Sequence, residues 1–132
     1  MEKNNTNTMK KLLAIAITLL IHFFSLSQKE VDFGPTIEFE RETFIVKPIN
    51  SDTLQVRFIV KNTGTQNLEI YSVNPSCGCT VVNFNHVIEP GKQDIIWVKI
   101  ANPNPPFSKS VLVNSNDVKR PDVILYVKSE IQ

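Results

Sequence analysis

The sequence predicts an all-β fold, an antiparallel β-sandwich of about seven strands over residues 36–132. First, apolar and polar residues alternate there with the two-residue period of half-buried strands. Second, clusters of Gly, Pro and Asn, which are typical of turns, separate these segments roughly every 8–12 residues. Third, no segment of this region shows the helical period. Such short strands in a domain of about 100 residues are typical of an immunoglobulin-like sandwich. An open barrel is the alternative.

The first strands are predicted between residues 37 and 75. Residues 37–46 form either one long strand or two short ones. The clearest strand covers residues 54–61, LQVRFIVK, where apolar side chains alternate with polar ones except at Ile59. Residues 62–64, Asn-Thr-Gly, predict a turn because Asn and Gly tolerate positive φ. Residues 68–75 continue as a strand that ends at a proline, which cannot donate a hydrogen bond to the ladder.

Four more strands are predicted in the second half of the chain. A short one covers residues 80–84, and a turn with Pro ahead of Gly, the type II preference, follows at residues 89–92. Residues 94–100, DIIWVKI, are apolar on both faces, which places that strand centrally in a sheet. A proline-rich loop at residues 102–106 separates it from the last two strands. These cover residues 107–113 and 123–127. The turn residues are expected to be Gly64, Gly78, Pro90 and Gly91.

The N-terminus has the layout of a secretory signal peptide. Lys10 and Lys11 precede an apolar run at residues 12–24, and Ser25-Leu26-Ser27 offers small residues for cleavage. The run is shorter than the ~20 apolar residues of a membrane span. We therefore expect cleavage near Ser27, a mobile lead-in at residues 28–35, and an exported domain at residues 36–132. That domain would be periplasmic, cell-surface or secreted, with no stable membrane insertion. A short uncleaved anchor is the alternative.

The charge balance points away from nucleic acid as a partner. The chain has 14 basic and 13 acidic residues. A nucleic-acid-binding domain usually carries a basic patch or a large positive charge. The adjacent basic pair outside the signal segment, Lys119-Arg120, stands between Asp117 and Asp122, which indicates a solvated turn.

The two cysteines, Cys77 and Cys79, are separated by a single glycine. In an extended strand their Cα atoms would be about 6.6–6.8 Å apart, the far limit for a disulfide, so a bridge requires a turn at Gly78. Closing a loop of three residues adds only about 1.6 kcal/mol, against ~3 kcal/mol for fifteen residues, so a structural disulfide is a poor explanation. Three interpretations stay open: two packed thiols, a thiol–disulfide switch or interchain link, and a soft-metal pair for Cu(I) or Zn.

The chain resembles the bacterial domain-of-unknown-function family 1573, whose members are mostly exported. The resemblance covers roughly residues 37–131, and its most specific element is Ser76-Cys-Gly-Cys-Thr80. It also rests on these segments in this order: F58-I-V-K-N-T-G64, L68-E-I70, P90-G91, F107-S-K109 and S115-N116. It implies an immunoglobulin-like sandwich and no established activity. The chain departs from the family where glycines are usual, at T43-F-I-V-K47, at Pro105-Pro106 and at Ser129, which affects local bends.

No set of catalytic residues is recognisable. A Ser-His-Asp triad would have to use His86, which is expected in an exposed loop, and no nucleophile-elbow pattern occurs. Glu38 and Glu40 alternate along a strand and indicate a solvated face rather than a glycosidase pair. Trp97 is expected in the core between the sheets rather than as a sugar-stacking platform. We therefore expect a non-enzymatic, cofactor-free module that binds a protein or cell-envelope partner through an edge strand or end loops. The alternative is a thiol-redox or copper-handling protein.

Overall fold

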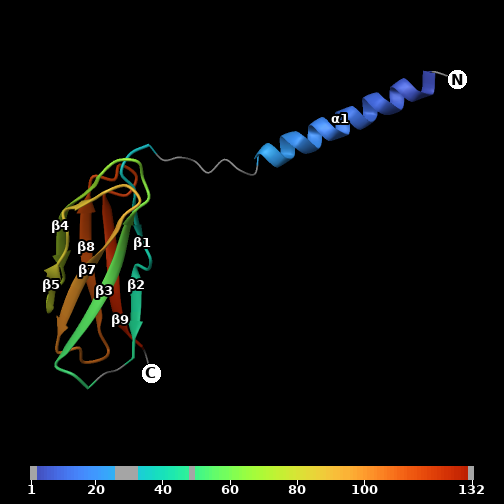
Figure 1. Cartoon of the computed structure of the whole chain (residues 1–132). Helices are drawn as coiled ribbons and strands as arrows, with labels where there is room; N and C mark the ends of the chain where they lie inside the picture. The colour runs from blue at the N-terminus through green and yellow to red at the C-terminus, as the bar shows by residue number, and fades with distance from the viewer. Residues whose placement is uncertain (1–2, 26–32, 48–49, 131–132) are drawn as a thin grey trace. The chain divides into compact units, whose positions relative to one another are not determined.

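The computed structural model describes residues 3–25, 33–47 and 50–130, and the chain divides into two units, Met1–Glu30 and Val31–Gln132 (Figure 1). The first unit contains one helix, α1 (Lys3–Ser25), which includes the predicted apolar run. Among the described residues, no helix is both long and apolar enough to cross a membrane. The predicted cleavage site after Ser27 lies outside the described residues.

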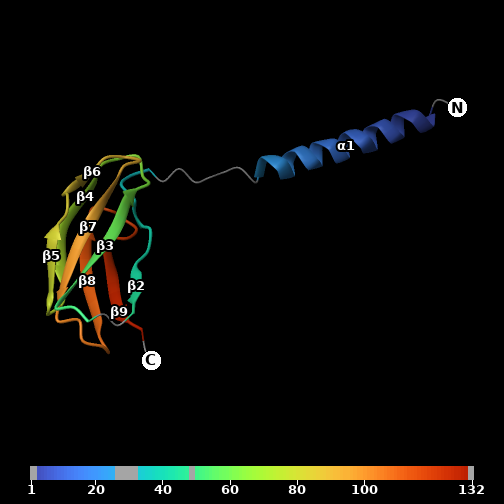
Figure 2. The same ribbon diagram turned by 60° about the horizontal axis from the view of Figure 1, so that its bottom comes forward.

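The second unit is built from strands, as predicted, and they form two sheets. The four-stranded sheet has the order β1-β3-β7-β5 and the five-stranded sheet the order β2-β9-β8-β4-β6; Figure 2 shows the short β6 beside β4. The strands are β1 (Ile37–Phe39), β2 (Thr43–Val46), β3 (Thr53–Asn62), β4 (Leu68–Pro75), β5 (Cys79–Asn83), β6 (Val87–Ile88), β7 (Gln93–Ala101), β8 (Ser108–Ser115) and β9 (Asp122–Ser129).

The prediction of about seven strands, all antiparallel, is wrong in two respects. The described residues contain nine strands, because residues 37–46 form two strands and because the two-residue β6 was not predicted. In addition, β2 pairs with β9 in parallel, whereas the other strand pairs are antiparallel. A two-residue strand is too short to show an alternation, and the sequence of β2 carries no signal for the direction of its neighbour.

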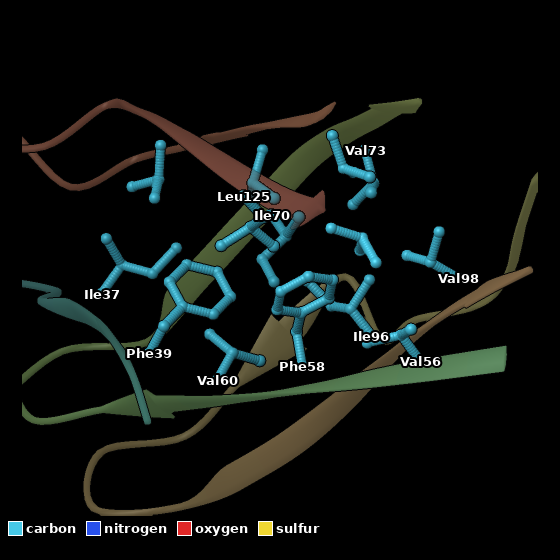
Figure 3. Close-up of a cluster of buried hydrophobic side chains, with 14 of the residues drawn as sticks. Ile37, Phe39, Val56, Phe58, Val60, Ile70, Val73, Ile96, Val98 and Leu125 are labelled. Carbon is cyan, nitrogen blue, oxygen red and sulfur yellow. The ribbon is translucent and has the colours of Figure 1, made fainter. Parts of the chain in front are cut away.

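One hydrophobic core takes side chains from both sheets (Figure 3). Alternate residues of β3 enter it, as the pattern of residues 54–61 predicts, and Phe58 is fully buried. The Phe58 ring meets the edge of Phe44 from β2, with ring centroids 5.1 Å apart. In β4, a bulge between Ile70 and Ser72 shifts the alternation, so that Ile70 and Val73 are both buried although they are three residues apart.

The chain passes from one sheet to the other between β1 and β2. The backbone N–H of Glu40 still donates to Ile59 O in the four-stranded sheet (3.0 Å). Two residues later, Glu42 O accepts a hydrogen bond from the N–H of Tyr126 in the five-stranded sheet (2.7 Å). Residues 40–42 therefore connect the open edges of the two sheets on the same side of the core.

Gly64 occupies the predicted turn, but not for the predicted reason. Its φ is not positive; instead, a Cβ atom at this position would lie 2.0 Å from Gly34 O and 2.7 Å from Thr36 N. The missing side chain lets the N-terminal segment lie directly on the turn, where Gly34 O accepts a hydrogen bond from Thr65 N–H (2.8 Å). Residues 28–32 of the predicted mobile lead-in lie outside the described residues. Its end is hydrogen-bonded to the domain from Gly34 onward.

Asn62 is fully buried, and its side-chain amide is completely hydrogen-bonded. Its Oδ1 accepts hydrogen bonds from the N–H groups of Gly64 (3.0 Å) and Thr36 (3.3 Å). Its Nδ2 donates to Gln66 O (2.7 Å) and Ile88 O (2.9 Å). One side chain thus joins β3, β6 and the segment that leads into β1, which the interpretation of Asn62 as a turn residue did not anticipate.

Candidate functional site

The Cys-Gly-Cys segment forms a tight turn between the two sheets. The turn begins where β4 of one sheet ends at Pro75 and stops where β5 of the other sheet begins at Cys79. The N–H of Cys79 donates to Ser76 O (3.1 Å), and Gly78 has a φ of 81°. Glycine adopts this left-handed conformation without the steric cost that other residues incur. The backbone therefore makes a turn at Gly78, which is the condition that the sequence sets for bringing the two cysteines close together.

Hydrogen bonds to β7 and β8 fix the position of this turn. Ser76 N–H donates to Ser110 O (2.8 Å), and Ser110 N–H donates back to Ser76 Oγ (3.1 Å). On the other side, Gly78 O accepts from Ala101 N–H (3.0 Å). The turn is therefore attached to both sheets and is not a free loop.

Lys109 from β8 lies against the turn. Its Nζ donates to Cys77 O (2.8 Å), and a Cβ atom on Gly78 would be 3.3 Å from that Nζ. Within residues 33–47 and 50–130, no carboxylate forms an ion pair with Lys109. The positive charge beside the two thiols is therefore not neutralised by an acidic side chain in that part of the chain.

Cys77 and Cys79 are free thiols in different environments. Cys77 is exposed, whereas Cys79 is half-buried and packs against the hydrophobic core. Burial raises the pKa of the Cys79 thiol, and a hydrogen bond with Ser76 and the charge of Lys109 partly offset that rise. The charge of Cys77 raises the pKa further and is the smallest of these contributions. The neutral thiol is thus the favoured form of Cys79.

The strand that follows the turn forms an open edge of the four-stranded sheet. β5 pairs with β7 on one side and is the last strand in the order of its sheet (Figures 1 and 2). Val82 lies where a bulge interrupts this pairing, and this residue is 55% exposed. The sequence between Glu69 and Glu89 contains no Asp, Glu, Lys or Arg. This edge therefore has no charged side chain in or near it along the chain.

Trp97 does not lie in the core, contrary to the prediction. It is half-buried and alternates with Ile96 and Val98, which are fully buried. It therefore occupies the outer face of the four-stranded sheet, opposite Arg57 of β3 and Asn83 of β5. The prediction that its strand is central is confirmed, since β7 has neighbours on both sides.

The remaining candidates are dispersed over the domain. His86 is exposed and has its Nδ1 3.0 Å from Ile70 O. Glu38 and Glu40 are exposed, as expected for a solvated face. Pro90 and Gly91 form the predicted turn: Lys92 N–H donates to Glu89 O (3.0 Å), and Gly91 has a φ of 75°. Among the described residues, no group of three or more His, Cys, Asp or Glu side chains is arranged to hold a metal.

The Lys119-Arg120 turn contains a structural feature that the sequence did not reveal. Asp117 is buried, and its Oδ1 accepts hydrogen bonds from the N–H groups of Lys119 (2.8 Å) and Arg120 (3.1 Å). Its Oδ2 accepts from Ile37 N–H (2.8 Å), which fixes the start of β1. The Arg120 guanidinium forms an ion pair with Glu42 (2.6 Å). The exposed positions of the basic pair agree with a surface turn, and Asp117 organises it.

Comparisons with known proteins identify the domain but not its activity. A family model described as "Protein of unknown function (DUF1573)" matches residues 37–131. No curated protein matches the chain. The crystal structure of a protein of unknown function from Porphyromonas gingivalis W83 is similar, with a TM-score of 0.67 and 16% identity over 79% of this chain. The chain spans 50% of that protein's length.

Two solved proteases contain a region with a similar fold. The secreted serine protease VesC from Vibrio cholerae matches 80% of this chain with a TM-score of 0.54 and 13% identity. The VesB protease of the same organism matches 74% with a TM-score of 0.53 and 6% identity. The chain corresponds to 24% of VesC and 32% of VesB. At these identities the likeness concerns the fold alone.

Proposed function

Because the chain belongs to the family of proteins of unknown function DUF1573, we propose that it is an exported, non-catalytic, immunoglobulin-like module of that family. This proposal includes the Ser76–Thr80 segment as the characteristic turn of the family. Two sheets around one core and the strand spacing support the immunoglobulin-like assignment. The basic, apolar and small-residue regions at residues 10–27 support export. The module binds an extended segment of another protein.

The open edge at β5 is the observation on which this function rests. Natural sheet edges are usually short or carry charges, prolines or bulges, because unpaired backbone groups attract other strands. Compared with the other three edge strands, β5 is the longest: β1 has 3 residues, β2 has 4, β6 has 2 and β5 has 5. β5 has a bulge at Val82 but lacks charge entirely.

The chemistry of this edge favours a strand from a partner. Backbone hydrogen bonds along β5 would supply affinity, and the exposed Val82 would add apolar contact to alternate side chains of an incoming strand. β2 presents Ile45, which is 69% exposed, but Glu42 and Lys47 flank that strand. Charge at both ends of β2 opposes the close approach of a second backbone, whereas at β5 the charge of Lys109 lies against the turn before the strand and the bulge at Val82 interrupts only part of the edge.

Site-specific photo-crosslinking in the native cell tests this function. A photoreactive residue at Val82 should give an adduct of one discrete mass, and one at Ile45 on the other open edge should not. Thr80→Lys, which adds a charge to β5, should abolish the adduct at Val82. Equal adducts at both positions, no adduct, or an adduct of twice the mass of the chain would contradict binding of a partner strand; the last would show self-association.

The same experiment reports export. The mass of the mature chain should correspond to a polypeptide that begins at Gln28. Retention of residues 1–27 would show instead that the N-terminal helix stays attached as an anchor.

A further inference from the structure

We propose that the Cys77-Gly78-Cys79 turn is a binding site for one monovalent soft metal ion, Cu(I), held between the two thiolates. This site is independent of partner binding at β5. Cys79 is also the first residue of β5, but the metal site uses its side chain, whereas partner binding uses backbone groups of that strand.

The position of the two thiols is the first argument. They flank a turn that is closed by a hydrogen bond from Cys79 N–H to Ser76 O and has a positive φ at Gly78, so the chain between them is not extended. A metal–sulfur bond is about 2.3 Å long, so a linearly bound ion separates two sulfurs by roughly 4.6 Å. A disulfide needs about 2.0 Å and a Cβ separation near 3.8 Å. Two thiols that are not bonded to each other therefore have to approach less closely for a bridging ion than for a disulfide.

The number of ligands selects the metal. Zinc in structural sites takes four ligands, and calcium takes six or more oxygen ligands. The described residues offer no group of three or more His, Cys, Asp or Glu at this or any other place. Soft thiolates select Cu(I), which is stable with two sulfur ligands. Two thiols without a third donor among the described residues therefore fit Cu(I) better than Zn²⁺.

The charge of Lys109 completes the site. Binding converts Cu⁺ and two thiols into a bis-thiolate complex of charge −1 with release of two protons, and no electrons are transferred. The Lys109 ammonium, which donates to Cys77 O at 2.8 Å and has no carboxylate partner within residues 33–47 and 50–130, supplies the compensating positive charge. Lys109 is thus a positioning and charge-balancing residue rather than a ligand.

Access is available from solvent. Cys77 is exposed, so an ion can enter through its sulfur and then reach Cys79, which lies half-buried against the core. The turn itself is hydrogen-bonded to β7 and β8, which keeps the backbone of the site in place before metal arrives. Such preorganisation lowers the cost of ordering the ligands.

The test is an anaerobic competition titration of the full chain with Cu(I) against a chromophoric Cu(I) chelator. We expect one Cu(I) per chain. Cys77→Ser and Cys79→Ser should each weaken binding at least ~100-fold, since a single thiolate remains. Lys109→Gln should weaken it about tenfold by removing a nearby charge, whereas Lys128→Gln, on the neighbouring strand β9, should leave it unchanged. No competition with the chelator, or wild-type affinity in either cysteine variant, would overturn the proposal.

A second measurement requires no mutation and so does not depend on the folding of the variants. X-ray absorption at the copper K-edge of the loaded chain should report two sulfur neighbours. Three or four neighbours, or one copper for every two chains, would show a site shared between copies and would overturn a site within one chain. Equal competition by Zn²⁺ at the same thiols would overturn the selectivity for Cu(I).

Discussion

At the scale of single residues, the domain depends on a few buried polar side chains that form hydrogen bonds with backbone groups. Asn62 and Asp117 are buried, and their side chains hold the segment before β1 and the start of β1 by hydrogen bonds. Buried polar groups that lose their partners cost about 1–3 kcal/mol each. These residues therefore affect stability more than their residue types, which are common in turns, would suggest.

Replacement of Asn62 by alanine should lower the free energy of unfolding by about 2–4 kcal/mol, because four backbone groups lose their partner. Urea unfolding followed by Trp97 fluorescence measures the change. Asn67→Ala is the control: this neighbouring asparagine is exposed, and its replacement should change the free energy by less than ~0.5 kcal/mol. Similar decreases in the free energy of unfolding in both variants would show that the hydrogen bonds of Asn62 do not stabilise the domain more than those of an exposed asparagine.

Gly64 and Gly91 should differ in their tolerance of alanine. A Cβ atom at Gly64 would collide with Gly34 O, so Gly64→Ala should cost about 3 kcal/mol or more. Gly91 has open space around it but a positive φ, so Gly91→Ala should cost only about 1–2 kcal/mol. The two unfolding midpoints, measured side by side, test this order. A reversed order would mean that backbone strain outweighs the close approach at Gly64.

The two thiols should react at different rates. Burial raises the pKa of the Cys79 thiol, so at neutral pH it carries less thiolate than an ordinary cysteine, and its half-buried position slows attack further. Alkylation with iodoacetamide, located by peptide mass, should modify Cys77 first. The alkylation rate of Cys79 should still be rising at pH values where the alkylation rate of an ordinary thiol has reached its plateau. Equal rates at pH 7 would contradict this prediction.

The same pKa shift has a consequence for stability. The folded chain keeps the Cys79 proton in a pH range where the unfolded chain has lost it. The free energy of unfolding therefore falls as pH rises through this range. Stability should therefore decrease as pH rises from the pKa of an unfolded thiol toward the raised pKa of the folded one. Cys79→Ser should remove this pH dependence.

At the scale of strands, the two faces of β7 test the register of the four-stranded sheet. Ile96 is fully buried toward the core, whereas its neighbour Ile95 is half-buried on the outer face. Ile96→Ala should cost about 2–5 kcal/mol, and Ile95→Ala should cost clearly less. Equal losses in urea unfolding would indicate that the outer face is covered as fully as the core.

The strand pattern in the sequence located most elements but could not orient all of them. Where polar and apolar residues alternate, as in β3, the buried face was predicted correctly. In β7 both faces are apolar, so the alternation does not show which face enters the core. Whether Trp97 points into the core or outward depends on how β7 pairs with β3, and the sequence does not reveal that pairing. The role of Asn62 was missed for a related reason. Asparagine is favoured in turns whether or not the fold later buries it.

The candidate site was predictable only in part. The turn at Gly78 was expected as the condition for bringing the cysteines close, and the structure contains it. The contact of Lys109 with that turn was not predicted, because the two segments are 32 residues apart in sequence. Contacts between strands depend on which strands pair, and no pattern within a single sequence predicts that pairing.

At the scale of the whole molecule, the buried core side chains of the described residues all lie between Ile37 and Val127. Removal of residues 1–30 should therefore leave the thermal unfolding midpoint within about 2 °C of the full chain, since no core side chain is lost. Removal of residues 1–36 also takes away Gly34 and Thr36, which bond to the Asn62 turn, and should lower the midpoint by several degrees more. Identical midpoints for both truncations would show that this attachment is dispensable.

The parallel pairing of β2 with β9 also bears on the order in which the protein can assemble. Residues 43–46 pair with residues 126–129, which lie some eighty positions further along the chain. During synthesis, this edge of the five-stranded sheet therefore stays unpaired until residues 126–129 have been added. The five-stranded sheet can therefore reach its full width only after both ends of the domain have been synthesised.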